Sequence, residues 1–97
     1  MAGIIDMIKS GVLSEESLIR EIKDSVAKGW NVNQKDECGC RPLMLTESPK
    51  VAKELIASGA DVNAEDNHGN TALRWAKAKG NDGVVTVLIA AGARQRS

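Results

Sequence analysis

Residues 62–76, which read VNAEDNHGNTALRWA, decide the fold. Gly69 supplies the backbone freedom that a tight turn needs. Thr71 offers a hydroxyl group that can cap a helix beginning at the next residue. Leu73 and Ala76 are three residues apart, so they share one face of that helix. The same pattern occurs thirty residues earlier, where residues 32–43 read VNQKDECGCRPL. Four positions of the earlier copy recur in the later one: Asn33, Asp36, Gly39 and Leu43 become Asn63, Asp66, Gly69 and Leu73.

A second motif repeats together with the first. The sequence GWNVN at residues 29–33 matches GADVN at residues 59–63, and AGA at residues 91–93 begins a third copy. Self-similarity at this period is typical of one supersecondary unit stacked on copies of itself. The combination of D-x-x-G-x-T-A-L with a later G-A-D-V-N resembles the ankyrin repeat over residues 29–93. The resemblance implies an all-α, ankyrin-like solenoid of stacked helical hairpins with short β-turn fingers, and it implies binding to other proteins.

One departure from the ankyrin pattern concerns a helix start. The family's T-P-L-H reads TALR at residues 71–74 and RPLM at residues 41–44. Because the side chain of Arg41 cannot accept a hydrogen bond, the helix that follows it lacks the usual side-chain cap. We expect this loss to cost about 1 kcal/mol.

The other departure concerns length. The spacing from Leu43 to Leu55 is 12 residues, whereas the spacing from Leu73 to Leu88 is 15. The earlier unit has therefore lost about one helical turn near residues 46–49. We expect a shortened first helix there, with a groove or flat patch where the turn is missing.

Length and composition exclude several classes of function. The chain of 97 residues is short enough for a single domain, and 13 basic and 13 acidic residues give it a net charge of zero. We expect no binding to nucleic acid, because no basic excess is present and Tyr and Phe are absent. The apolar N-terminal stretch is interrupted by Asp6 and Lys9, so it predicts neither a signal peptide nor a membrane span. We therefore expect a cytoplasmic protein without membrane contact.

The predicted domain covers residues 1–97 and contains three units. Residues 1–33 are an N-terminal capping helix pair, in which Gly11 ends a short helix and Ser14 caps a longer one. Residues 34–63 are the shortened repeat, with a finger near 34–40, a helix near 42–47 and a second helix that Ser48 caps and Pro49 opens. Residues 64–97 are the C-terminal repeat, with a finger near 64–70 and helices near 72–79 and 83–91.

The final predicted helix, near residues 83–91, is more apolar than expected for a helix that ends an array and faces water. In one interpretation most of its side chains pack inward. In the other, this face is covered by a partner or by a second copy of the chain, which would make a homodimer through the C-terminal helix. The side chains concerned are Val84, Val85, Val87, Leu88 and Ile89.

Three residues suggest chemistry that their number and spacing do not support. Cys38, Cys40 and His68 could approach one another if neighbouring fingers stack, but zinc takes four ligands. A disulfide between residues two apart would be strained, so free thiols are expected. No Ser-His-Asp or Cys-His arrangement is present. The sequence therefore predicts no catalytic residue, metal or cofactor, and a thiol- or metal-dependent enzyme built on these three residues is an alternative hypothesis.

The resemblance implies a partner surface made of the fingers and the concave face of the helices. Met44, Arg74 and Trp75 would form the concave wall, and the other predicted contact residues are the variable positions of the repeat. These are Lys35, Glu37, Cys38, Cys40, Glu65, Asn67, His68, Asn70, Ala78 and Lys79.

Trp30 and Trp75 are the only aromatic residues, and each could fill the core or lie in a binding hot spot. The predicted function is stoichiometric binding of another protein. A general adaptor and a dedicated inhibitor or immunity-type protein (host, bacterial or phage) that blocks one target enzyme are the two versions of this hypothesis.

Overall fold

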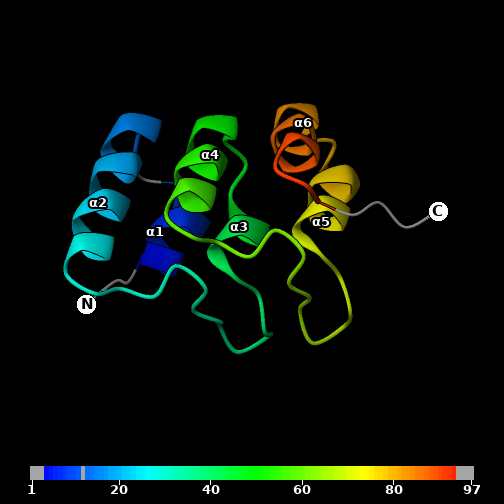
Figure 1. The fold of residues 1–97 in the computed structure, drawn as a ribbon, viewed down its shortest axis with the longest axis horizontal. Coiled ribbons are helices and arrows are strands. Elements are labelled where there is room, and N and C mark those ends of the chain that lie inside the picture. The colour runs from blue at the N-terminus through cyan, green and yellow to red at the C-terminus, as the bar shows by residue number, and fades with distance from the viewer. Residues whose placement is uncertain (1–3, 12, 94–97) are drawn as a thin grey trace.

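The computed structural model describes residues 4–11 and 13–93. Residues 1–3 and 94–97, the ends of the predicted first and last units, lie outside the described residues. The described residues form six helices and no strand, which confirms the predicted all-α architecture (Figure 1). The helices are α1 (Ile4–Ser10), α2 (Glu15–Ala27), α3 (Pro42–Leu45), α4 (Pro49–Ala57), α5 (Ala72–Lys79) and α6 (Asp82–Ala90).

The first helix pair begins and ends where local sequence signals place its limits. Gly11 follows α1, and Ser14 caps α2 by accepting a hydrogen bond from the backbone N–H of Ser17 at 3.2 Å. Glu15 and Glu16 lie in the first turn of α2, where the helix dipole favours negative charge. The predicted cap of this helix is therefore confirmed.

The shortened repeat has the predicted form. Helix α3 has only four residues, and Arg41 at its N-cap makes no side-chain capping hydrogen bond. The Nε of Arg41 is buried without a hydrogen-bond partner. Ser48 caps α4 by accepting from the N–H of Val51 at 3.3 Å, and Pro49 occupies its first turn. A cavity of about 430 Å³ lies where the missing turn would be, between the end of α1, the start of α2 and residues 45–48. The expected groove is therefore present.

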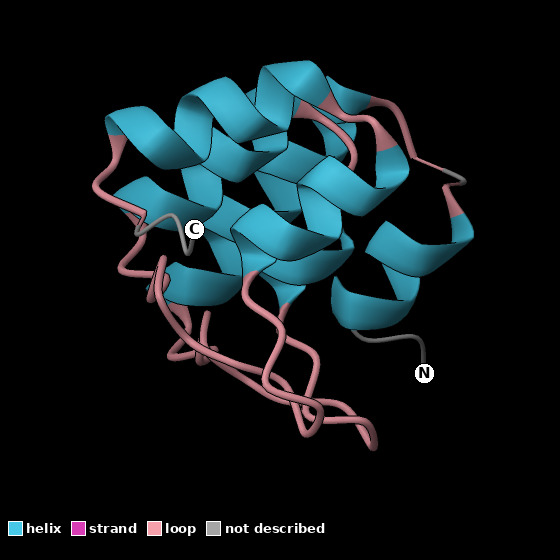
Figure 2. Ribbon diagram, turned by 90° about the vertical axis from the view of Figure 1, so that its right-hand side faces the viewer, coloured by secondary structure: helices cyan, strands magenta, loops and turns pink. Residues whose placement is uncertain are grey.

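The helices form two layers. In the inner layer α3 lies between α1 and α5, and in the outer layer α4 lies between α2 and α6. Figure 1 shows the two layers with the loops before α3 and α5 projecting together from one side, and Figure 2 shows the same loops from the end of the array. The array thus buries a continuous core between layers, since each pair contacts its neighbours.

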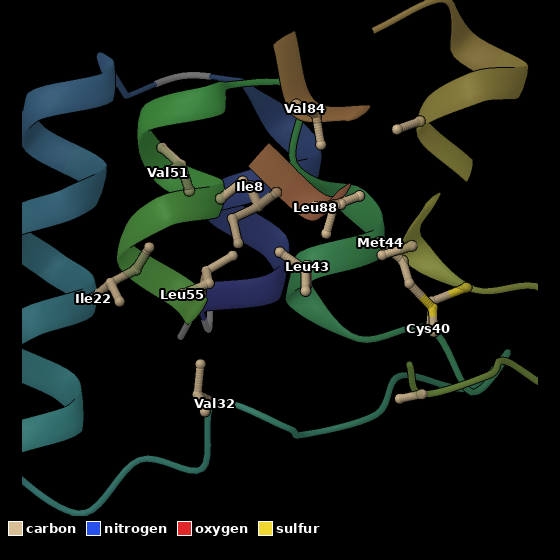
Figure 3. Close-up of a cluster of buried hydrophobic side chains, with 14 of the residues drawn as sticks. Ile8, Ile22, Val32, Cys40, Leu43, Met44, Val51, Leu55, Val84 and Leu88 are labelled. Atoms are coloured by element: carbon tan, nitrogen blue, oxygen red, sulfur yellow. The ribbon is translucent and has the colours of Figure 1, made fainter. Parts of the chain in front are cut away.

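The core is aliphatic and runs through all three helix pairs. Leu43 and Leu73 occupy equivalent places in α3 and α5, and both are buried. Figure 3 shows the buried side chains from both layers converging between the helices. Among its largest fully buried side chains are Ile22, Val51, Leu55, Val84 and Leu88.

Helix α6 agrees with the interpretation that most of its apolar side chains pack inward. Val84 and Leu88 are fully buried, and Val85 and Val87 are partly buried against the core. Ile89 is the exception, because it is 42% exposed. At the start of this helix Gly83 lies so close to α4 that an added Cβ would be 2.6 Å from the Cγ of Pro49, so the two outer helices approach closely at this point.

A side-chain amide connects the loops of neighbouring units. The Nδ2 of Asn33 donates to the carbonyl oxygen of Gly59 at 3.1 Å, and its Oδ1 accepts from the N–H of Asp61 at 2.8 Å. Both loops therefore keep a fixed spacing, because one planar amide satisfies a donor and an acceptor on the next unit.

Candidate binding surface

Two turns of the same design project from the helices, and we call them finger 1 (residues 34–40) and finger 2 (residues 64–70). In finger 1 the Oδ1 of Asp36 accepts from the N–H groups of Cys38 and Cys40, both at 2.9 Å. In finger 2 the Oδ1 of Asp66 accepts from the N–H groups of His68 and Asn70 at 2.8 and 2.9 Å. Each aspartate thus holds its own turn.

The second carboxylate oxygen of each aspartate faces a different partner. The Oδ2 of Asp36 lies 2.9 Å from the Nζ of Lys9 in α1. The Oδ2 of Asp66 accepts a hydrogen bond from the Nε1 of Trp75 in α5 at 3.0 Å. Finger 1 is therefore tied to the preceding helix pair, whereas finger 2 is tied to its own helix.

These contacts lower the pKa of both aspartates. Burial alone would raise the pKa of Asp36, but the ion pair with Lys9 and the N–H groups of Cys40 and Cys38 outweigh burial. For Asp66, the N–H of Asn70 lowers the pKa most, burial opposes it, and the N–H of His68 and the indole of Trp75 lower it further. Both side chains are consequently carboxylates at neutral pH, as their roles as acceptors require.

The two fingers contact each other directly. The N–H of Asn67 in finger 2 donates to the carbonyl oxygen of Cys38 in finger 1 at 3.2 Å. Gly39 has a φ of 77°, and a Cβ at this position would lie 2.9 Å from the backbone nitrogen of Asn67. Only glycine gives both the left-handed backbone and the space for this approach. The fingers therefore form one coupled surface.

Most of the predicted contact residues are accessible on the fingers and inner helices. Asn70 and Trp75 are partly buried, and the following residues are exposed: Lys35, Glu37, Cys38, Glu65, Asn67, His68, Arg74, Ala78 and Lys79.

Two predicted contact residues are buried, so their assignment to the surface is wrong. Cys40 is 4% exposed and Met44 is 2% exposed. Figure 3 shows both side chains lying between α3 and the chain of the next repeat. Their positions are covered because α5 packs against α3, which the pattern of a single repeat does not reveal.

Trp75 lines a shallow hollow on α5. The hollow has a volume of about 220 Å³ and is lined by Asn70, Arg74, Trp75 and Ala78. The Nζ of Lys79 lies 5.3 Å from the centroid of the indole ring, which is within the range of a cation–π interaction.

Trp30 lies at the other end of the array. It is partly buried against the core, and its Nε1 donates to the Oε1 of Gln34 at 2.8 Å. It also lines a hollow of about 420 Å³ together with Ile4 and Met7 of α1. The indole therefore combines a packing contact with an accessible edge.

Sequence reasoning did not identify Lys9 as part of this surface. Lys9 and finger 1 line a hollow of about 580 Å³ between α1 and the loop before α3. Lys9 precedes the recognisable repeats, so no repeated position indicated its contact with Asp36.

The thiols and the histidine are not arranged for chemistry in the described residues. Cys38 and Cys40 are free, and no group of three or more His, Cys, Asp or Glu side chains in the described ranges could hold a metal ion. Burial raises the pKa of the Cys40 thiol, and the nearby Asp36 carboxylate raises it further. A buried and protonated thiol is a poor nucleophile.

A comparison with protein-family models identifies the fold. Residues 12–97 match the model described as ankyrin repeats (3 copies). The chain belongs to the ankyrin repeat family. The repeats of this family are generally protein-binding modules, and the ankyrin fold is typically a non-enzymatic scaffold.

Proteins similar to this ankyrin-repeat chain come from several animals. The chain is 33% identical over 61 residues to the nuclear factor NF-kappa-B p105 subunit of Gallus gallus, covering 60% of this chain and 6% of that protein. It is 30% identical over 95 residues to palmitoyltransferase Hip14 of Drosophila melanogaster, covering 94% and 14%. It is 42% identical over 60 residues to neurogenic locus notch homolog protein 2 of Homo sapiens, covering 59% and 2%. The chain thus spans a small part of each of these proteins.

A solved structure has the same architecture. The ankyrin repeat domain of human ASB11 superposes with a TM-score of 0.80 at 25% sequence identity, covering 100% of this chain and 42% of that chain. The predicted ankyrin-like solenoid is therefore confirmed. None of the described helices has both the length and the apolar character needed to cross a bilayer.

Proposed function

We propose that this ankyrin-repeat protein binds another protein stoichiometrically through the two fingers and the accessible face of α5. The observation that carries the proposal is the coupling of the fingers. Asp36 and Asp66 fix each turn, and the N–H of Asn67 bonds to the carbonyl oxygen of Cys38 in the neighbouring turn. The backbone of these turns is therefore held in place before a partner arrives, which lowers the entropy cost of binding.

Site-specific crosslinking tests this proposal. The photoreactive residue p-benzoylphenylalanine is placed at Glu37 or His68 on the fingers, or at Lys53 or Thr86 on the outer layer, and the four variants are irradiated in the source cells. All four positions are exposed, so the outer pair is a matched control. We expect crosslinks to partner protein from the finger positions and none from the outer positions. Crosslinks from the outer positions alone would contradict the proposal, and native mass spectrometry of the complex would give the stoichiometry.

The two versions of the function differ in their partner. A dedicated inhibitor would abolish the activity of one crosslinked enzyme when added at an equimolar amount, whereas an adaptor would crosslink to several proteins and leave their activities unchanged. The same irradiated cells, when fractionated, would test the cytoplasmic location that the sequence predicts. We also propose that residues 1–33, 34–63 and 64–97 are the three units of the array, with the first as its cap.

A homodimer through the C-terminal helix is a separate proposal, which the exposure of Ile89 supports. Sedimentation velocity over a hundredfold range of concentration would test it. A concentration-dependent dimer that disappears in Ile89→Glu is the expected result, and a monomer at all concentrations would contradict it.

A further inference from the structure

The hollow on α5 lies along one stripe of the helix. Arg74 and Ala78 are four residues apart, so they lie on the same side of α5, and Asn70 lines the hollow from the end of finger 2. Trp75 completes the lining of the hollow. Arg74 and Ala78 therefore mark the side of α5 that faces the hollow.

The preceding repeat shows what that side of the helix contacts. Asn70 and Arg74 are equivalent to Cys40 and Met44, thirty residues earlier. Cys40 and Met44 are buried where α5 packs on α3, and Figure 3 shows both on the side of α3 that meets the next repeat. The stripe on α5 is thus the continuation of an established stacking interface. Among the described helices α5 packs against α3 and α6 only, and the two apolar residues are replaced by polar ones.

The indole in this hollow is held in a fixed position. Its Nε1 donates to the Oδ2 of Asp66, and the Oδ1 of the same carboxylate is held by the N–H groups of finger 2. A large aromatic side chain that is already ordered loses little entropy when a partner covers it. Such residues are favoured as anchors in protein interfaces.

The accessible charges around the indole are positive. Arg74 is exposed, and the Nζ of Lys79 lies 5.3 Å from the ring centroid. The Asp66 carboxylate is buried and already accepts hydrogen bonds from the indole and from its own turn. The other two carboxylates of this repeat are Glu65 in finger 2, with Oε1 3.5 Å from the Cβ position of Gly69, and Asp82 in the first turn of α6.

From this geometry we infer that the hollow binds an acidic peptide segment of the partner protein, with one apolar side chain of the segment on Trp75 and its carboxylates against Arg74 and Lys79. The inference rests on the proposed function, because it gives the chemistry of the partner at one end of the same surface. Charge complementarity of this kind raises specificity and the association rate.

Fluorescence anisotropy with labelled peptides tests the inference. The probes are the peptide EDEDLDEDE, a basic twin KRKRLRKRK, and EDEDSDEDE, which lacks the apolar side chain. We expect the acidic leucine peptide to bind at least about tenfold more tightly than either twin, which corresponds to about 1.4 kcal/mol. Arg74→Glu should weaken binding by at least about tenfold, because it reverses the charge at the rim. Lys53→Glu makes the same charge change on the outer layer and should alter binding by less than about twofold.

Three results would overturn the inference. The first is equal binding of the acidic and basic peptides, and the second is equal affinity of Arg74→Glu and Lys53→Glu, once circular dichroism shows that both are folded. The third is a concentration-dependent dimer that Arg74→Glu abolishes, because a second copy would then occupy the hollow. If the peptides fail while crosslinks from His68 persist, the proposed function stands and only this inference is wrong. Loss of both would contradict the proposed function as well.

Discussion

The contact between the fingers makes a specific prediction for two glycines. Gly39 and Gly69 occupy the same place in their turns, with φ values of 77° and 78°. A Cβ at Gly69 would be 3.5 Å from the Oε1 of Glu65, which is an ordinary contact, whereas a Cβ at Gly39 would be 2.9 Å from the backbone nitrogen of Asn67. Substitution with alanine therefore imposes the same backbone penalty at both positions but a steric overlap at only one.

The magnitudes follow from that difference. Gly69→Ala should cost about 1 kcal/mol, since a left-handed conformation is unfavourable for a residue with a Cβ. Gly39→Ala should cost about 2 kcal/mol more, because the overlap with the backbone of Asn67 requires finger 2 to move. For a domain of this size the extra loss corresponds to a decrease in Tm of about 8–16 °C relative to Gly69→Ala. It is a large part of a total stability of roughly 5–15 kcal/mol.

Urea denaturation followed by far-UV circular dichroism measures both changes. The two variants should have the same m-value, because the surface exposed on unfolding is unchanged. If the free energies of unfolding of Gly39→Ala and Gly69→Ala agree within about 0.5 kcal/mol, the fingers do not pack against each other in solution, and the coupled surface that carries the proposed function does not exist.

Three further predictions concern stability. Arg41→Thr should stabilise the protein by about 1 kcal/mol in urea denaturation, since it gives α3 the cap that Thr71 provides for α5 and removes a buried Nε without a partner; no gain would show that α3 cannot use a cap. Leu88→Ala should lower the free energy of unfolding by about 3 kcal/mol and Ile89→Ala by less than about 1 kcal/mol, because only Leu88 is fully buried. Equal losses in urea denaturation would mean that Ile89 makes a packing contact that the structure lacks. Finally, the pKa of Asp66 is lowered in the folded state from its ordinary value of 3.8, so its stabilising effect is complete above that pH and is lost as the pH falls through the folded pKa. Asp66→Asn should therefore reduce the dependence of Tm on pH below about pH 4. Thermal melts of both proteins between pH 2 and pH 6 measure this dependence, and an equal dependence in the two proteins would contradict the prediction.

The parts of the fold that depend on local sequence could be predicted. The caps at Ser14 and Ser48, the missing cap at Arg41 and the shortened α3 each follow from a few neighbouring residues, and all are present. The groove beside α3 follows from counting residues between Leu43 and Leu55. These features involve the backbone of one segment, for which propensity and spacing are sufficient.

The parts of the site that depend on stacking could not be predicted from one repeat. The repeat pattern places Cys40 among the variable positions and Met44 on the concave wall, but the next inner helix covers both side chains. The bond between Trp75 and Asp66 joins residues nine apart in the chain, and the ion pair of Asp36 joins it to a helix outside the repeat motif. Contacts of this kind depend on how the units pack, and the secondary-structure propensity of a single segment carries no information about that packing.

The placement of the two indoles has a spectroscopic consequence. Trp30 belongs to the loop after the first helix pair and Trp75 to the last pair, and the chain contains no tyrosine or phenylalanine to add a background. When the protein is excited at the red edge of its absorption band, the fluorescence therefore comes from two indoles, one near each end of the solenoid. Replacing either with phenylalanine leaves the other as a native probe, so that fraying of one end can be followed in time without attaching a dye.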